Sequence, residues 1–135
     1  MGLRLAIVTP VRSVVDTEAD SVVAPGSEGE LGILPGHAPL LVALKPGLVT
    51  WAEGGRTSRV VIGGGFAEVT QEHVTVLANS AEAAERIDPA EAEARRAKAA
   101  AELDDAGFAA PPEQLAKLRT ALDLAQARVD AVLRH

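Results

Sequence analysis

The stretch Ile87-Asp88-Pro89-Ala90-Glu91-Ala92 separates two parts of the chain that differ in composition. Residues 1–88 hold 13 valines and 11 of the 12 glycines, whereas residues 89–135 hold 15 alanines and only three β-branched residues. β-Branched side chains favour strands, and alanine favours helices. The sequence therefore predicts an α+β protein, with an all-β sandwich over residues 1–88 followed by an antiparallel two-helix hairpin over residues 89–135.

The first part consists of short apolar runs separated by turn residues. Leu3, Leu5 and Ile7 alternate with more exposed positions, as in a half-buried strand. The connections are too short for helical crossovers, so a parallel doubly wound sheet is excluded and a sandwich or barrel is favoured. The further expected strands are 14–15, 21–23, 40–44, 48–52, 59–62, 66–69 and 74–78, with turns at Pro25-Gly26, Pro35-Gly36, Pro46-Gly47 and Gly54-Gly55.

The helical part begins with a recognisable start signal. Asp88 can cap the first turn, Pro89 suits the first helical position, and Glu91 can reach back as in a capping box. This helix is expected to run to about Asp104 or Asp105, with Gly107 as its terminator, and a second helix is expected to begin at Pro111-Pro112.

The second helix presents a narrow apolar seam, and the first offers mostly methyl groups. Alanine–leucine packing buries little apolar area, so we expect a weakly held hairpin that can detach from the β part or rearrange. The seam consists of Leu115, Leu118, Leu122, Ala125, Val129 and Val132, the spacing with which one helix meets a single partner helix.

Composition excludes several classes of function. The chain has no cysteine, which rules out disulfides and thiolate chemistry. Its net charge of −6 argues against a nucleic-acid surface, and the only aromatic residues are Trp51, Phe66 and Phe108. No apolar run approaches the length of a membrane span, and the start of the chain lacks the pattern of a signal peptide. We expect a soluble protein without a metal site, since its three histidines, His37, His73 and His135, are scattered.

Gly63-Gly64-Gly65 follows a predicted strand and could be taken for a phosphate-binding loop. Such a loop needs a helix directly after it and usually a lysine, whereas Phe66 to Val69 looks like another strand. A β-bulge or a close crossing of strands explains these glycines better.

The carboxylates of Asp16, Glu18 and Asp20 alternate as on a solvated strand face, and no histidine or aromatic wall accompanies them. Glu28 and Glu30 lie in a glycine-rich loop and are better candidates for contact with a partner. We therefore assign no catalytic residue.

His37 stands between Pro35 and Pro39 in a stiff loop. It has no serine or aspartate in a recognisable triad arrangement, so a structural or contact role is favoured. A loop that is held in shape by two prolines suits an interface.

Arg95, Arg96 and Lys98 form a basic patch on the first helix. One interpretation is a solvated face paired with Glu91, Glu93 and Glu102 at helical spacing. The other is a contact for an anion or nucleotide, completed by basic residues of the second helix such as Lys117, Arg119 or Arg128.

The segment from Ser27 to Leu41, which reads SEGELGILPGHAPLL, resembles the signature of the epsilon subunit of F-type ATP synthases, called delta in mitochondria. The resemblance continues through Ile7-Val8-Thr9-Pro10, Lys45-Pro46-Gly47, Gly64-Gly65-Phe66 and Val74 to Ala78. The resemblance covers residues 1–88 in order. Over residues 89–135 it rests on the shared two-part architecture.

The resemblance implies a non-catalytic rotor subunit of a proton-translocating synthase. The family's β-sandwich binds the gamma subunit and sits on the ring of c subunits, coupling ring rotation to the catalytic head. Glu30, with Glu28 beside it, matches the loop that faces the c ring, and His37 and Pro39 fall in the segment near gamma. The family works as a peripheral membrane component, so we expect the cytoplasmic face of a bacterial inner membrane.

In some members the hairpin extends into the alpha/beta head and inhibits ATP hydrolysis, and ATP holds it compact. Those members resemble Ile-Asp-x-x-Arg-Ala at the start of the first helix, and this chain has Glu91 in place of that arginine. A carboxylate repels phosphates, so we expect no ATP cofactor. The candidates for a nucleotide contact are Asp88, Arg95, Arg96 and Arg128.

Two alternatives belong to other classes. The first is a free-standing β-sandwich adapter or ligand-binding module, since fold does not imply function. A concave apolar pocket with converging polar groups would favour it, whereas an exposed apolar strip on one face would favour docking to gamma. The second is a nucleotide hydrolase that uses Gly63-Gly64-Gly65.

Overall fold

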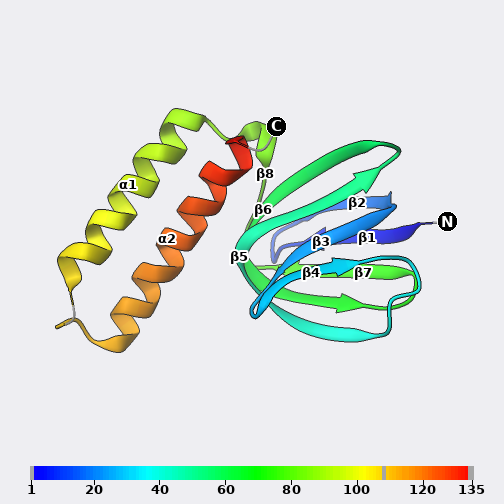
Figure 1. The fold of residues 1–135 in the computed structure, drawn as a ribbon, viewed down its shortest axis with the longest axis horizontal. Coiled ribbons are helices and arrows are strands. Elements are labelled where there is room, and N and C mark those ends of the chain that lie inside the picture. The colour runs from blue at the N-terminus through cyan, green and yellow to red at the C-terminus, as the bar shows by residue number, and fades with distance from the viewer. Residues whose placement is uncertain (1, 108, 134–135) are drawn as a thin grey trace.

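A computed structural model describes residues 2–107 and 109–133 of the chain. An N-terminal β-sandwich is followed by two antiparallel helices, and α2 lies between the sandwich and α1 (Figure 1). The predicted α+β class and the order of its two parts are confirmed. Phe108 and His135, named above among the aromatic residues and histidines, lie outside the described residues.

The strands form one strongly bent mixed sheet that folds over itself. Its order is β2-β1-β7-β6-β5-β3-β4, with β8 paired to β6, and β1 and β7 run parallel. The strands are β1 (Leu3–Val8), β2 (Ser13–Ala19), β3 (Ser21–Gly26), β4 (Gly29–Ile33), β5 (Leu40–Glu53), β6 (Arg56–Val69), β7 (His73–Ala78) and β8 (Ala81–Ala83), followed by the 3-10 turn Ala84–Arg86.

Two of the predicted turns are wrong. Pro46-Gly47 lies inside β5, where Pro46 is opposite Gly63, so the two expected strands 40–44 and 48–52 are one. Pro25-Gly26 ends β3 and pairs with β4. Both β5 and β6 have 14 residues and stay paired in the same register on both sides of Pro46 and Gly63, so the expected strands 59–62 and 66–69 are one as well.

The core lies between the two layers and follows the predicted alternation. Leu3, Leu5 and Ile7 of β1 are fully buried, as are Val74 and Val76 of the neighbouring β7. Because successive side chains of a strand point to opposite faces, the intervening residues of these strands face outward.

The glycine run of β6 permits a close approach between strands, as expected. A Cβ on Gly65 would lie 2.0 Å from the carbonyl oxygen of Leu77, and the Gly65 backbone has a φ of +145°. Phe66 and the residues after it continue β6, so no helix follows this run. A phosphate-binding loop has no helix N-terminus here to supply its donors.

The two helices begin and end close to the predicted residues. α1 spans Pro89–Ala106 with Gly107 after it, and α2 spans Pro112–Leu133. The Asp88 carboxylate accepts a hydrogen bond from the Ala90 backbone N–H at 3.0 Å and caps α1. Neither helix, within the residues described, is long and apolar enough to cross a membrane.

α2 uses two faces, and the sequence predicted one. Ala125 of the predicted seam is buried, and Leu115, Leu118 and Leu122 are half-buried. A second face packs on the sandwich, where Ala127 and Ala131 are buried in a separate cluster with Val61, Ile87 and Ala92. Val129 and Val132 pack against this second cluster, although the sequence assigned them to the seam with the first helix.

Candidate functional site

The β3–β4 turn presents the predicted carboxylates to solvent. Glu28 and Glu30 are both exposed, and Glu30 pairs in register with Pro25. Glu30 also borders a cavity of about 280 Å³ between the sandwich and α2, which Lys45, Asp123 and Asp130 help to line. This acidic turn therefore lies beside the compact hairpin.

The loop between β4 and β5 holds His37 in a tight turn. The His37 backbone N–H donates to the Leu34 carbonyl at 3.1 Å, and the ring Nδ1 lies 2.7 Å from the Ala38 carbonyl oxygen. The Gly36 N–H donates to Gln71 at 2.9 Å and ties the loop to the β6–β7 turn. The imidazole is thus a local structural or contact group, and Pro39 beside it is exposed.

The structure does not bring these two predicted contact regions together. Glu28 and Glu30 lie near the start of β4, and His37 and Pro39 follow its end. Figure 1 shows the β4–β5 loop at the end of the sandwich that is remote from the helices. Two partners can therefore reach the two regions at the same time.

A strip of apolar side chains crosses the outer face of the sheet next to the His37 loop. Phe66 of β6 is paired with Ala43 of β5 on one side and with Leu77 of β7 on the other. Phe66 is 54% exposed, Leu77 is 55% exposed and Leu41 is 70% exposed. We call Leu41, Ala43, Phe66 and Leu77 the outer strip; exposed large apolar residues that are contiguous in this way mark interaction sites.

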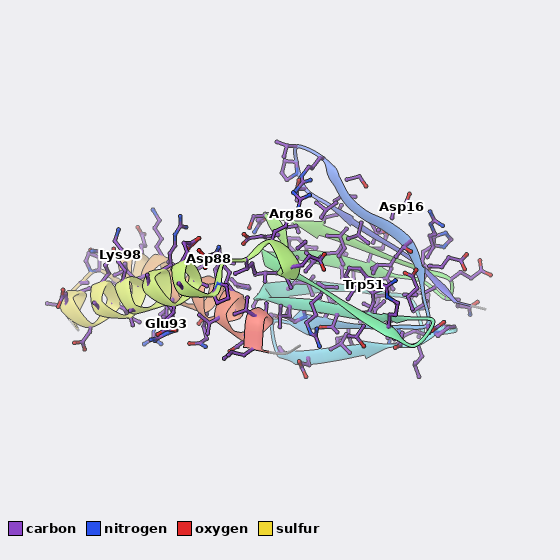
Figure 2. All side chains as sticks on the ribbon, turned by 90° about the horizontal axis from the view of Figure 1, so that it is seen from above. Asp16, Trp51, Arg86, Asp88, Glu93 and Lys98 are labelled. Carbon is purple, nitrogen blue, oxygen red and sulfur yellow. The ribbon has the colours of Figure 1, made fainter. Side chains whose placement is uncertain are left out.

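Two of the four nucleotide candidates are engaged by neighbours within α1. Asp88 accepts the capping hydrogen bond from Ala90, and Arg96 forms an ion pair with Glu93 one turn before it. The hydrogen bond from Arg96 lowers the pKa of the Glu93 carboxyl below its usual value. Figure 2 shows Asp88 where the hairpin meets the sandwich and Glu93 further along α1.

Arg128 of α2 is held by two carboxylates from two other elements. Its Nε donates to Glu82 Oε1 of β8 at 2.8 Å, and its Nη1 and Nη2 donate to the two carboxylate oxygens of Glu91 in α1 at 3.0 and 2.9 Å. The Arg128 side chain is only 11% exposed. The hydrogen bonds from Arg128 lower the pKa of Glu91, and the two carboxylates raise the pKa of Arg128.

The expected capping box is therefore wrong. Glu91 does not reach back to the start of α1, because a bidentate hydrogen bond to a guanidinium is stronger than one to a backbone N–H. Arg95, the remaining nucleotide candidate, lies 3.6 Å from the same Glu91 carboxylate. The predicted pairing of basic and acidic residues on α1 is confirmed for Arg95 and Arg96.

The other acidic cluster has structural contacts. Asp16 forms an ion pair with Arg4 at 2.7 Å, and Asp20 accepts a hydrogen bond from the Gly54 backbone at 3.1 Å. Across the described residues, no group of three or more histidine, aspartate or glutamate side chains is placed to hold a metal ion.

Sequence reasoning missed the outer strip and the role of Glu82. The alternation of β6 after the glycine run, with Ala67 and Val69 buried and Phe66 and Glu68 exposed, carries the signal for the strip. No local signal marks Glu82, because its partner Arg128 is 46 residues away in the sequence.

The family model and the similar sequences all point to one family of proteins. The sequence model of the family described as "ATP synthase, Delta/Epsilon chain, beta-sandwich domain" matches residues 2–84. The ATP synthase epsilon chain of Pelotomaculum thermopropionicum is 54% identical over 96 residues, covering 71% of this chain and 72% of that one. The epsilon chain of a Cyanothece species is 40% identical over 128 residues, covering 95% of this chain and 91% of that one.

The fold also matches solved structures. A chain in a cryo-EM structure of the Euglena gracilis mitochondrial ATP synthase, OSCP/F1/c-ring, superposes with a TM-score of 0.81 at 24% identity, covering 98% of this chain and 82% of that one. A chain from the central stalk and c ring of the Tetrahymena thermophila mitochondrial ATP synthase gives a TM-score of 0.61 at 14% identity. At these identities the likeness concerns the fold.

Proposed function

This chain belongs to the ATP synthase delta/epsilon chain family, as a non-catalytic stalk subunit of the rotary ATP synthase, and we propose that it couples rotation of a c ring to the catalytic head through gamma. The coupling ion in this proposal is the proton. The sandwich transmits torque, and the hairpin regulates hydrolysis.

The outer strip is the observation that supports docking to gamma. It presents three large apolar side chains on adjacent strands, where a monomer would leave mostly polar groups. The His37 loop leads directly into Leu40 and Leu41, so the loop and the strip form a continuous surface. Rigid, contiguous apolar area of this kind suits a partner that stays bound during rotation.

Glu28 and Glu30 are the proposed contacts to the c ring. They lie in a two-strand turn that is held by the pairing of β3 and β4, so a load on the turn is passed into the sheet. A β-hairpin that is braced in this way resists deformation better than an irregular loop. Because this turn and the outer strip are separate, the turn can contact the c ring while the strip contacts gamma.

The hairpin is proposed to act on the alpha/beta head without ATP as a cofactor. Asp88 is engaged in the helix cap, and Arg95, Arg96 and Arg128 all lie beside carboxylates of their own chain. A phosphate would have to displace Glu91 from Arg128 while meeting its negative charge. Titration of the full chain with MgATP is expected to give no binding heat; binding below about 1 mM would contradict this point.

As part of the ATP synthase, the chain belongs to a membrane-associated complex. We propose that it lies at the cytoplasmic face of a bacterial inner membrane and is held there through the c ring and gamma.

Binding to gamma tests the proposal. Phe66→Ser combined with Leu77→Ser is expected to weaken the affinity of the chain for purified gamma by at least about a hundredfold, because the substitutions remove two large apolar contacts. Leu133→Ser is the matched control, since Leu133 is 75% exposed and lies at the end of α2, outside the strip. Equal affinities for the two variants would refute docking through the strip.

A further inference from the structure

One side chain joins the hairpin to the sandwich. Arg128 projects from α2, and its guanidinium is shared between Glu82 of β8 and Glu91 of α1. Both helices and strand β8 of the sandwich therefore contribute to one charged cluster. Four hydrogen bonds connect it, with lengths from 2.8 to 3.4 Å.

An apolar contact lies beside this cluster. Ala92, Ala127 and Ala131 are buried there with Val61 and Ile87, and the partly buried side chains around them are Leu48, Ala84, Leu124, Val129 and Val132. This contact and the charged cluster together hold the hairpin against the sheet, and only the charged cluster depends on ionised side chains.

The surroundings of Arg128 strengthen its interactions. The side chain is 11% exposed, against 39% for Glu82 and 44% for Glu91. An ion pair that is partly removed from water is screened less than one at the surface. Arg128 also lines two cavities beside the hairpin, of about 370 and 330 Å³, so its truncation leaves further space unfilled.

We propose that the Glu82–Arg128–Glu91 cluster is an interdomain clip, which means that it keeps the hairpin packed against the sandwich without a bound ligand. Glu91 is the internal anion of this clip, because both of its carboxylate oxygens are bonded to the guanidinium. Release of the hairpin requires the guanidinium to leave both carboxylates. Its regulatory consequence rests on the proposed function of the hairpin, whereas the clip itself is a property of the isolated chain.

α1 supplies a matched control for each partner. Arg96 and Glu93 also form an arginine–glutamate pair with a lowered carboxyl pKa, but both belong to α1 and do not reach the sandwich. Arg96→Ala and Glu93→Gln therefore change charge and helix composition as Arg128→Ala and Glu91→Gln do, and leave the junction intact.

Amide hydrogen exchange of the isolated full chain tests the clip. Arg128→Ala is expected to speed exchange at least about tenfold over residues 124–132, through local opening of the hairpin, while the amides of β1 and β7 keep their rates. Glu91→Gln is expected to give a smaller increase in the same residues. Raising the salt concentration from 0.05 to about 1 M is expected to speed these amides in the unsubstituted chain.

Equal exchange in Arg128→Ala and Arg96→Ala would overturn the clip. If Arg128→Ala unfolds the whole chain, the exchange rates of Glu91→Gln and Glu93→Gln are compared instead. Equal rates in these two variants would also overturn the clip. Gamma is absent from the experiment, so loss of the clip and loss of docking through the outer strip are distinguished.

Discussion

Asp88 stabilises the start of α1 through a single hydrogen bond to the Ala90 backbone. Removing this bond leaves a backbone donor without its partner, so Asp88→Ala is expected to lower the stability of α1 by about 1 kcal/mol. Asp88→Asn keeps an acceptor of the same length and is expected to retain most of that stability. Exchange rates of the first amides of α1 measure the difference, and equal loss in both variants would contradict capping as the cause.

The carboxyl group of Glu91 is expected to make the stability of the compact hairpin depend on pH. The hydrogen bond from Arg128 lowers the folded-state pKa of Glu91 below its ordinary value of 4.5, with Arg95 adding to the effect. Stabilisation from a lowered carboxyl pKa is present above the unfolded pKa and is lost as the pH falls through the folded pKa. The protection of the hairpin amides, measured relative to their intrinsic exchange rates at each pH, is therefore expected to fall below about pH 4.5, the usual glutamate range.

Glu91→Gln is the control for this acid dependence. A glutamine side chain does not titrate in this range, so the acid response of the hairpin is expected to be smaller in the variant than in the unsubstituted chain. An unchanged acid response in Glu91→Gln would exclude Glu91 as the group responsible.

At the scale of residues, the sequence predicted what is local. The cap at Asp88 and the glycine requirement near Gly65 follow from neighbours along the chain or from the chemistry of one residue type. The role of Glu91 did not follow, because a capping box and a distant arginine compete for the same carboxylate. Only the position of α2 against α1 decides which partner is within reach.

β6 is shaped by its glycine run, and Gly65 is its most constrained position. A Cβ there would meet the Leu77 carbonyl oxygen at 2.0 Å, on a backbone with a φ of +145°. Gly65→Ala is expected to destabilise the sandwich by more than about 2 kcal/mol through clash and backbone strain. Thermal unfolding measures this effect.

Gly32 of β4 offers the matched control for Gly65. A Cβ at Gly32 has nothing within 4 Å, and its φ is not in the left-handed region. Gly32→Ala is expected to be neutral or slightly stabilising. A similar fall in melting temperature for both variants would mean that close strand approach is not the reason for Gly65.

At the scale of elements, strand existence was predicted better than strand continuity. Pro46-Gly47 has the composition of a turn, yet β5 passes through it with Pro46 opposite Gly63. The bend between layers needs the same residue types as a reversal, so the local sequence does not distinguish them. The second face of α2 was missed because Val129 and Val132 also fit the spacing of a seam with one partner helix, and because alanine does not indicate which side of a helix is buried.

In the whole molecule the hairpin lies beside the sandwich, and the two parts meet near Asp88 (Figure 2). If the hairpin inhibits the head, removing it is expected to raise ATP hydrolysis by an assembled catalytic head several-fold. A chain ending at Asp88 provides the comparison with the full chain. Equal hydrolysis rates would leave the sandwich as the working part and contradict a brake.

A map of cross-links in the assembled synthase tests whether the sandwich lies between the c ring and gamma. The chain has no cysteine, so single substitutions such as Phe66→Cys and Glu30→Cys can each be labelled alone with a photoactivated cross-linker. Position 66 is expected to join gamma, and position 30 is expected to join subunit c. Thr57→Cys, which is exposed near the other end of β6, measures background labelling. Failure of position 66 to join gamma, or cross-linking of position 30 to gamma alone, would contradict the proposed placement between ring and gamma.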